Sequence, residues 1–233
     1  MPITLTPEEW TALLLSLRVA SVATLVSLPL AILVALILAR GRFRGKILLD
    51  GLVHLPLVLP PVVTGYALLL LFGRQGPIGA MLDSVFGFVL AFRWTGAALA
   101  AAVMGFPLMV RAIRLSIEAI DPRLEAAAGT LGASRLIRFA TITLPLALPG
   151  VLAGTVLGFA KALGEFGATI TFVSAIPGET QTLPAAIYAY TQTPGGDAGA
   201  LRLSVLAVIV ALAALAFSEL LARRVKRASA LVV

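Results

Sequence analysis

The stretch EAAAGTLGASRLIRFATITLPLALPG, residues Glu125–Gly150, joins a short polar segment to a long apolar one. Asp121 and Pro122 stand just before it, and an Asp cap followed by Pro at the first helical position is a typical helix start. Gly132 is a typical helix terminator, and Ser134 is a suitable cap for a second short helix. We therefore expect two short polar helices that lead directly into a membrane span.

Apolar residues dominate the composition: 60% of the 233 residues are hydrophobic, 12% are charged, and the mean hydropathy is +1.04. A soluble domain does not need so much apolar surface, so lipid must surround most of the chain. The chain has no cysteine and a single histidine, His54, which leaves little material for metal sites or for a Cys nucleophile. We expect an all-α membrane protein with no metal and no cofactor of its own.

Five stretches are apolar over the roughly 20 residues that a membrane span needs. A sixth stretch, residues 183–192, is too short to cross and is interpreted as a partial or re-entrant helix. We expect one transmembrane domain over residues 1–233, with a polar segment at 121–142 and five spans near residues 10–39, 47–72, 95–117, 144–173 and 201–222.

Basic residues gather in three of the connections. Residues 40–46, 111–138 and 223–227 hold 13 of the 18 Lys and Arg, whereas the connections 73–93 and 174–200 hold two. By the positive-inside rule, the N-terminus lies outside and the C-terminus lies in the cytoplasm. The formal net charge of +7 therefore reflects membrane topology and does not indicate a nucleic-acid partner.

The first short helix of the polar segment carries an apolar face. Leu124, Ala127, Ala128 and Leu131 recur there at helical spacing. A solvated connector between two spans would not need such a face, whereas a docking element for another protein would. The pattern favours docking and leaves the connector as the alternative.

The same segment resembles the EAA motif of type I ABC importer permeases: Gly132 is followed after nine residues by Ile142, Leu144 and Pro145. In that family the motif forms cytoplasmic coupling helices that sit in a groove of an ATPase subunit. Six residues before Gly132, the position of the usual Glu holds Ala126, and Glu125 lies one residue early. The resemblance implies a type I ABC importer permease fold, in which residues 121–142 are the coupling segment and the ATPase contacts come from Leu124, Glu125, Ala127, Ala128, Leu131, Gly132 and Ala133.

Two charged residues, Lys161 and Glu165, lie four apart within the fourth expected span. Charges inside a membrane usually face the bundle interior or a water-filled path. The pair therefore either neutralises itself to hold the fold together or lines a transport pathway. Gly150, Gly154 and Gly158 in the same span form a small-residue stripe, which predicts close packing against another helix.

Three prolines interrupt the second expected span: Pro56, Pro60 and Pro61. They predict a kinked helix, which either simply packs or lines a transport path. Thr64 stands one turn beyond and is placed to bond a freed carbonyl, and His54 is expected to make a structural hydrogen bond. The candidates for the pathway are Pro60, Pro61, Thr64, Lys161, Glu165 and Thr169.

Three later runs sharpen the resemblance: ALGEFGATITF (162–172), IPGETQTLPAAIY (176–188) and QTPGGD (192–197). They are similar to the permease subunits of molybdate importers and, more distantly, to those of sulfate and thiosulfate importers. The resemblance covers nearly the whole chain and implies import of a tetrahedral oxyanion, with molybdate favoured. It also implies a multi-pass protein of the bacterial cytoplasmic membrane, with two ATPase subunits that carry ATP and Mg, and with an external oxyanion-binding protein. Because five spans are too few to enclose a transport path, we expect the chain to work as a homodimer.

Other functions remain open. Within the family the substrate could be sulfate, thiosulfate or tungstate; in a different class, the chain could be a stand-alone secondary anion transporter with Lys161 and Glu165 as coupling charges. An intramembrane enzyme is not supported, because the sequence has no paired intramembrane carboxylates and no nucleophile with a base. It also lacks a G-x4-GK[ST] phosphate loop, so ATP hydrolysis is expected on a separate subunit.

Overall fold

The computed structural model describes residues 5–230, and the secondary structure along this range is helical. The elements, in chain order, are α1 (Pro7–Arg40), α2 (Lys46–Val58), α3 (Pro61–Phe72), α4 (Pro77–Phe86), α5 (Trp94–Glu118), α6 (Pro122–Thr130), α7 (Arg135–Arg138), the π-helix η1 (Phe139–Thr143), α8 (Leu144–Leu163), α9 (Gly167–Val173), α10 (Leu183–Thr191) and α11 (Asp197–Ala230).

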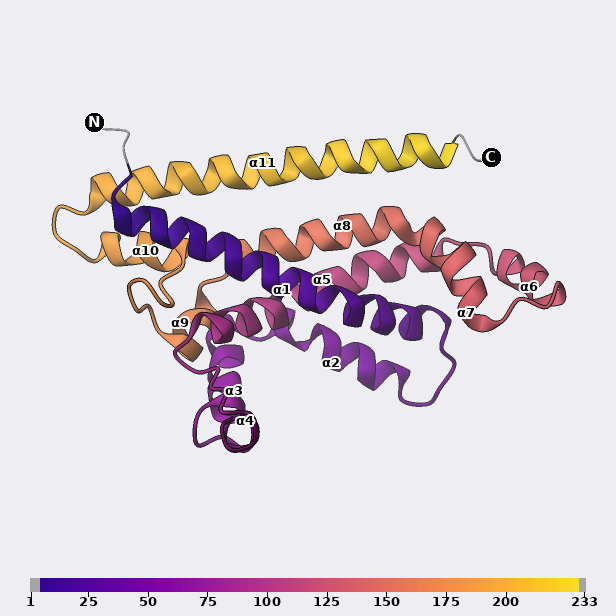
Figure 1. The fold of residues 1–233 in the computed structure, drawn as a ribbon, viewed down its shortest axis with the longest axis horizontal. Helices are drawn as coiled ribbons and strands as arrows, with labels where there is room; N and C mark the ends of the chain where they lie inside the picture. Colours follow the sequence, from indigo (N-terminus) through magenta and orange to yellow (C-terminus); the bar gives the residue numbers. More distant parts are fainter. Residues whose placement is uncertain (1–4, 231–233) are drawn as a thin grey trace.

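The long helices α1, α5, α8 and α11 run lengthwise along the molecule (Figure 1). Within the described range, four helices are long and apolar enough to cross a membrane, or five if the bent pair α2–α3 counts as one span. The short helices α6 and α7 lie at one end of the long axis, and α10 lies at the other (Figure 1). The predicted all-α membrane fold is thus confirmed.

The first span begins with a capping box. The Thr6 hydroxyl accepts from the Glu9 backbone N–H (3.2 Å), and the Glu9 carboxylate accepts from the Thr6 backbone N–H (2.8 Å). These two bonds satisfy donors that the first turn of a helix leaves free, and Pro7 fits the first turn because it has no N–H to satisfy. The helix then continues for 34 residues, past Pro29, to Arg40.

The stripe of glycines in α8 packs directly on α5, as the sequence predicts. A Cβ atom built on Gly150 would lie 2.2 Å from Ser116 Cβ, and one built on Gly154 would lie 3.0 Å from the Met109 carbonyl oxygen. One on Gly158 would lie 2.6 Å from Met109 Cγ. Only residues without a side chain allow the two backbones to approach this closely.

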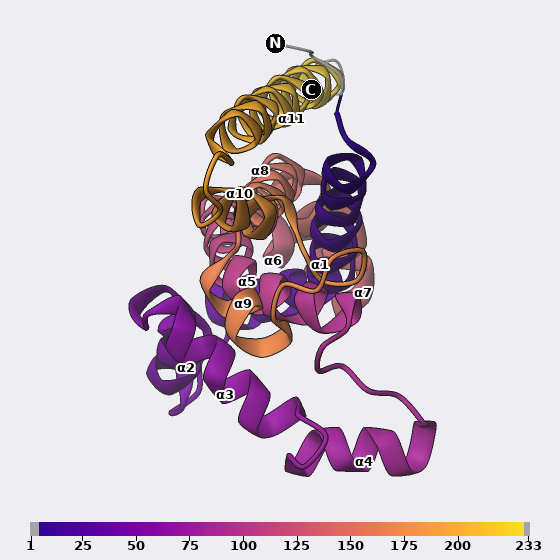
Figure 2. The ribbon, with the colours of Figure 1, turned by 90° about the vertical axis from the view of Figure 1, so that its left-hand side faces the viewer.

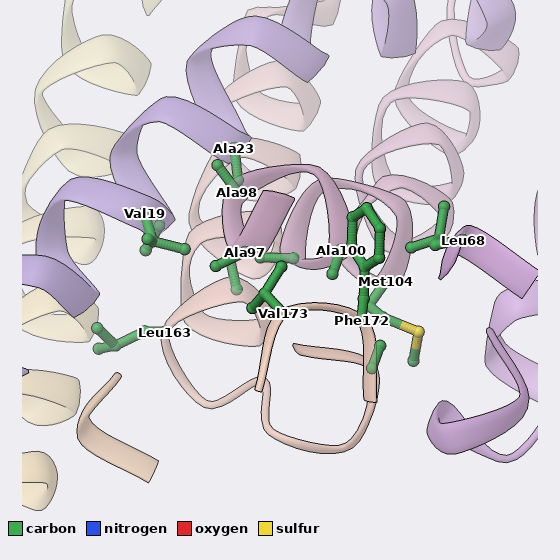
Figure 3. Packing of buried hydrophobic residues seen from close by; sticks show 14 of the residues in the cluster. Val19, Ala23, Leu68, Ala97, Ala98, Ala100, Met104, Leu163, Phe172 and Val173 are labelled. Atoms are coloured by element: carbon green, nitrogen blue, oxygen red, sulfur yellow. The ribbon is translucent and has the colours of Figure 1, made fainter. Parts of the chain in front are cut away.

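A core of small and apolar side chains ties the outer half of the bundle together. Figure 3 shows Val19 and Ala23 of α1 beside Ala97 and Ala98 of α5, with Leu68, Phe172 and Val173 closing the other side. Alanine dominates the contact between α1 and α5, so these helices approach closely and the larger residues fill the space toward α3 and α9.

The second expected span is broken rather than kinked. α2 ends at Val58, α3 begins at Pro61, and the two helix axes differ in direction by 114°. Pro56 lies inside α2, whereas Pro60 and Pro61 stand at the break, where each lacks the N–H that would continue the helical ladder. As a result α3 and the following α4 project away from the bundle (Figure 2).

The fourth expected span, residues 144–173, is not one helix. α8 ends at Leu163, Gly164 caps it, and α9 starts again at Gly167. The expected fifth span at 201–222 lies within α11, which starts earlier, at Asp197. The short stretch at 183–192 is the separate helix α10.

The two breaks lie against each other. A Cβ on Gly65 of α3 would lie 2.5 Å from the Ala168 carbonyl oxygen of α9, and a Cβ on Gly167 would lie 2.7 Å from Pro61 Cβ. The outer half-helices α3 and α9 therefore pack backbone to backbone, through contacts that join segments about a hundred residues apart in the chain.

Candidate functional site

The coupling segment, residues 121–142, has the two capped helices that the sequence predicts. The Asp121 carboxylate accepts from the Arg123 N–H (2.9 Å) at the start of α6, and the Ser134 hydroxyl accepts from the Ile137 N–H (3.3 Å) at the start of α7. Between them Gly132 adopts a left-handed conformation with a φ angle of 87°. That conformation turns the chain sharply and explains the need for glycine there.

Apolar side chains are left exposed on this segment. Every residue of α6 and α7 keeps part of its surface free, and Leu131 and Leu136 are 87% and 76% exposed. Of the residues predicted to contact a partner, Leu124, Ala127 and Gly132 are also exposed, and Ala128 and Ala133 are half-buried. Such an apolar surface at the end of a bundle is suited to docking another protein.

Sequence reasoning missed two members of this surface, Leu136 and Ile137, which are both exposed on α7. Their signal is the pattern RLIR directly after the Ser134 cap, in which two apolar residues stand on a helix too short to bury them. They extend the exposed surface from α6 across the turn to α7.

Glu125 points into the protein rather than outward. Its carboxylate Oε1 accepts hydrogen bonds from Arg40 Nη2 (3.2 Å) and from the Thr143 hydroxyl (2.9 Å). Its side chain is 23% exposed, whereas Leu131 on the same segment is 87% exposed. Among the predicted ATPase contacts, Glu125 thus differs from its neighbours because its carboxylate is already bonded within the chain.

The intramembrane charges Lys161 and Glu165 form an ion pair at the break between α8 and α9. Glu165 is 2% exposed, and its second oxygen accepts from the Ala168 N–H (2.9 Å) of α9. Glu165 lies beyond the end of α8, so the pair crosses the break instead of lying along one continuous helix. The contact neutralises the charges and supports the structural reading of the pair.

The other pathway candidates surround the same breaks. Pro60 and Pro61 begin α3, and Thr169 lies in α9, where its hydroxyl donates to the Phe166 carbonyl (2.8 Å). Thr64 is buried, and its hydroxyl has no hydrogen-bond partner among the described residues. The suggestion that Thr64 bonds a carbonyl freed by the prolines is therefore wrong.

Near the cytoplasmic ends of α2 and α5, His54 makes the structural bond that the sequence predicts. Its Nδ1 lies 2.9 Å from the Asp50 carbonyl oxygen, one turn earlier in α2. Arg114 of α5 donates to the carboxylates of Asp50 (3.0 Å) and Glu118 (2.8 Å). This network joins α2 to α5 on the cytoplasmic side of the break at Pro60.

At the opposite end of the molecule, an ion pair that sequence reasoning missed joins α1 to α11. Arg202 Nε donates to both oxygens of Glu9 (3.1 Å each), and Glu9 is almost fully buried. One further basic residue, Arg18, stacks its guanidinium over the Trp94 ring at 3.7 Å. The signal for both was the presence of basic residues inside expected spans, where charges need a partner.

Comparisons with known proteins agree with this geometry. Residues 27–227 match the family described as "Binding-protein-dependent transport system inner membrane component". The molybdenum transport system permease protein ModB of Escherichia coli K12 is 61% identical over 94% of this chain and 96% of its own length. ModB of Haemophilus influenzae is 59% identical over the same shares. The sulfate transport system permease protein CysT of Salmonella typhimurium is 37% identical over 80% of this chain and 67% of its own length.

Solved structures share the fold at low sequence identity. A bacterial alginate ABC transporter in complex with an alginate pentasaccharide-bound periplasmic protein aligns with a TM-score of 0.75 at 19% identity, over 94% of this chain and 80% of its own. An amino acid ABC transporter with histidines aligns with a TM-score of 0.65 at 19% identity, over 94% of both chains. This chain therefore has a fold that is also found in these ABC transporters.

Proposed function

Since this chain belongs to the family of binding-protein-dependent transport system inner membrane components, we propose that it is the permease subunit of an ATP-driven importer of molybdate. The observation that carries the substrate assignment is 61% identity to a molybdenum transport permease over 94% of the chain. The 37% identity to a sulfate permease, over a smaller share of both chains, makes sulfate the second candidate. Tungstate, a tetrahedral oxyanion of the same charge, is tested beside both.

The ATPase docks on the coupling segment. The chain has no phosphate loop, because GRFRGK (41–46) has the wrong spacing and no Ser or Thr after Lys46. Energy must therefore come from another subunit, and the exposed apolar side chains of α6 and α7 offer the contact surface. Leu124, Leu131, Leu136 and Ile137 fill the groove of that subunit, and the left-handed turn at Gly132 sets the angle between the two helices.

Two copies of the chain enclose the path. Five spans are too few to surround a water-filled channel, and the broken second span leaves a row of apolar side chains uncovered. These residues, on α2 and α3, are Leu52, Leu55, Val58, Val62 and Tyr66. A second copy that covers this row places the path on the two-fold axis, with one ATPase subunit on each coupling segment.

Transport follows by alternating access. An external binding protein delivers the anion to the outer face, and ATP-driven closure of the ATPase subunits moves the coupling segments. That motion reaches the breaks at Pro60 and Gly164, where half-helices can reorient without disturbing an intact helical ladder. The Lys161–Glu165 pair holds the break in the fourth span together during the cycle.

The competing class, a secondary transporter coupled through Lys161 and Glu165, fits the geometry less well. The two side chains neutralise each other, and the Glu165 carboxylate also accepts from the Ala168 N–H of α9. A charge engaged in this way is poorly available to carry an ion in each cycle. Such a transporter would also leave the exposed surface of the coupling segment without a role.

One experiment separates these functions. The chain is co-purified with the ABC ATPase subunits, reconstituted in proteoliposomes, and supplied with binding protein loaded with molybdate, tungstate or sulfate. ATP hydrolysis and uptake should rise together with molybdate-loaded protein. Stimulation by sulfate alone would transfer the assignment to sulfate, and uptake without any associated ATPase would support the secondary transporter.

A further inference from the structure

We infer that Glu125 is a positioning residue that fastens the coupling segment to the first and fourth spans, and that it does not contact the ATPase. The inference rests on the proposed function as a permease subunit. It concerns three side chains that lie far apart in the sequence and meet at one carboxylate: Arg40, Glu125 and Thr143. We call this cluster the Glu125 latch.

Arg40 supplies the first connection. It is the last residue of α1, and its Nη2 donates both to Glu125 Oε1 (3.2 Å) and to the carbonyl oxygen of Ile120 (3.1 Å). Ile120 lies two residues after the end of α5, where terminal carbonyls lack helical partners and attract a cation. One guanidinium thus joins the end of α1, the end of α5 and the body of α6.

Thr143 supplies the second connection. It is 2% exposed, it is the last residue of η1, and its hydroxyl donates to Glu125 Oε1 at 2.9 Å. Because η1 continues into α8, the bond joins α6 to the cytoplasmic start of the fourth span. A π-helix at this point also marks a place where the helix can adjust, since such turns are often found at functional sites.

Arg138 closes the latch from the other side. Its Nη1 lies 3.4 Å from the Glu125 carbonyl oxygen, and a Cβ on Gly129 would lie 3.2 Å from the same nitrogen. The guanidinium therefore lies against α6 where Gly129 leaves room for it. Both the carboxylate and the backbone carbonyl of Glu125 thus accept hydrogen bonds within the chain, while the neighbouring apolar side chains are exposed.

This arrangement predicts how a push from the ATPase is passed on. Without the latch, α6 is joined to α5 and α7 by short turns only, and a push could bend these turns without moving the spans. With the latch, α6 moves together with the ends of α1 and α8. Loss of the latch should therefore lower the amount of anion imported for each ATP hydrolysed, while ATPase association stays unchanged.

The test measures both quantities in proteoliposomes that hold the complete complex and molybdate-loaded binding protein. Glu125→Gln removes the charge that Arg40 pairs with, and Thr143→Val removes the second donor. Each variant should import on the order of fivefold less molybdate per ATP, the low end of typical coupling effects, because the Arg40 pair is partly exposed. Since both changes act on one carboxylate, the double variant should lose less than the product of the two effects.

Matched controls come from α8 and from the end of α1. Thr155→Val removes a hydroxyl that bonds only to the Val151 carbonyl within its own helix, and Arg42→Gln removes an exposed charge two residues from Arg40. Both variants should import as much molybdate per ATP hydrolysed as the unaltered chain. In the isolated chain, hydrogen exchange of the α6 amides should rise in Glu125→Gln and stay constant in Thr155→Val.

The outcomes are distinct. A Glu125→Gln chain that no longer co-purifies with the ATPase would assign the carboxylate to the subunit contact and overturn the latch. An unchanged import ratio together with unchanged hydrogen exchange would overturn it as well. If the unaltered complex itself shows no binding-protein-stimulated hydrolysis, the importer proposal fails, and the hydrogen-exchange result then decides the structural part alone.

Discussion

At the scale of single residues, Gly132 is a position of the coupling segment where the backbone favours glycine. Its φ of 87° costs an L-residue roughly 1–2 kcal/mol, although no neighbouring atom would touch a Cβ there. We expect Gly132→Val to insert normally in the membrane but to change the angle between α6 and α7. ATP-driven uptake in proteoliposomes should fall severalfold, while the yield of membrane protein stays the same.

A second left-handed glycine provides the control for this prediction. Gly87 ends α4 with a φ of 62° and also has open space around it, but it lies outside the coupling segment. Gly87→Val should therefore carry a similar backbone cost and leave uptake per ATP unchanged. Equal losses in both variants would indicate general destabilisation and would contradict the coupling role of Gly132.

Also at the residue scale, the Lys161–Glu165 pair makes a prediction about stability. The side chain of Glu165 is 1% exposed and that of Lys161 is 30% exposed, so Lys161→Met leaves a buried carboxylate without its cation. We expect a loss of about 2 kcal/mol, below the value for fully buried pairs because Lys161 is partly solvated. Thermal unfolding in detergent measures the loss, and Lys161→Met with Glu165→Gln should recover most of it. No recovery in the double variant would mean that the lysine acts through other contacts.

At the scale of elements, the contact between α5 and α8 depends on the glycine stripe. In Gly150→Leu a side chain would start 2.2 Å from Ser116 Cβ and 2.9 Å from the Ala112 carbonyl oxygen. Because one of these atoms is backbone, the helices must separate, and we expect little monodisperse protein after detergent extraction. Gly51→Leu, on α2 where a Cβ meets nothing within 4 Å, should extract normally. Normal extraction of both variants would show that α5 and α8 can repack.

The elements also show what a sequence can predict. The five apolar stretches, the caps at Asp121 and Ser134 and the stripe at Gly150 are local patterns, and each appears in the structure where its residues stand. The breaks within the second and fourth spans are different. Proline and glycine indicate where a helix is weakened, but they do not determine the angle between the two helices on either side. In its orientation at 114° to α2, α3 packs against α9, where Gly65 leaves room for the Ala168 backbone, and no local pattern contains that contact.

Ion pairs between residues far apart in the chain also could not be predicted from local sequence patterns. The sequence shows Glu9, Arg40 and Glu125 as separate charges near span ends, and nothing in their spacing connects them. The structure joins Glu9 to Arg202 and Glu125 to Arg40, across 193 and 85 residues. A search of each intramembrane or terminal charge for a distant opposite charge would have raised these pairs as hypotheses.

At the scale of the whole molecule, the proposed dimer can be tested without removing any native thiol, because the chain has no cysteine. Single cysteines at the exposed α2–α3 positions, namely Leu52, Leu55, Val58, Val62 and Tyr66, should give disulfide-linked dimers wherever a position meets its copy at the two-fold axis. Leu212→Cys, on α11 at the opposite side of the bundle (Figure 2), should stay monomeric on denaturing gels. Cross-linking at Leu212 alone would place the dimer contact on α11.

The continuous helical stretch from Arg135 to Leu163 has a mechanical consequence for the whole molecule. It contains 29 residues and is held to α5 along the glycine stripe centred on Gly154. Measured along the helix from Gly154, about 29 Å of it lies toward α7 and about 14 Å lies toward the Lys161–Glu165 break, at roughly 1.5 Å per residue. With the proposed docking of an ATPase on α6 and α7, a displacement of α7 therefore enters an unbroken run of helical backbone, which passes the α5 contact and ends at the point where the fourth span is broken.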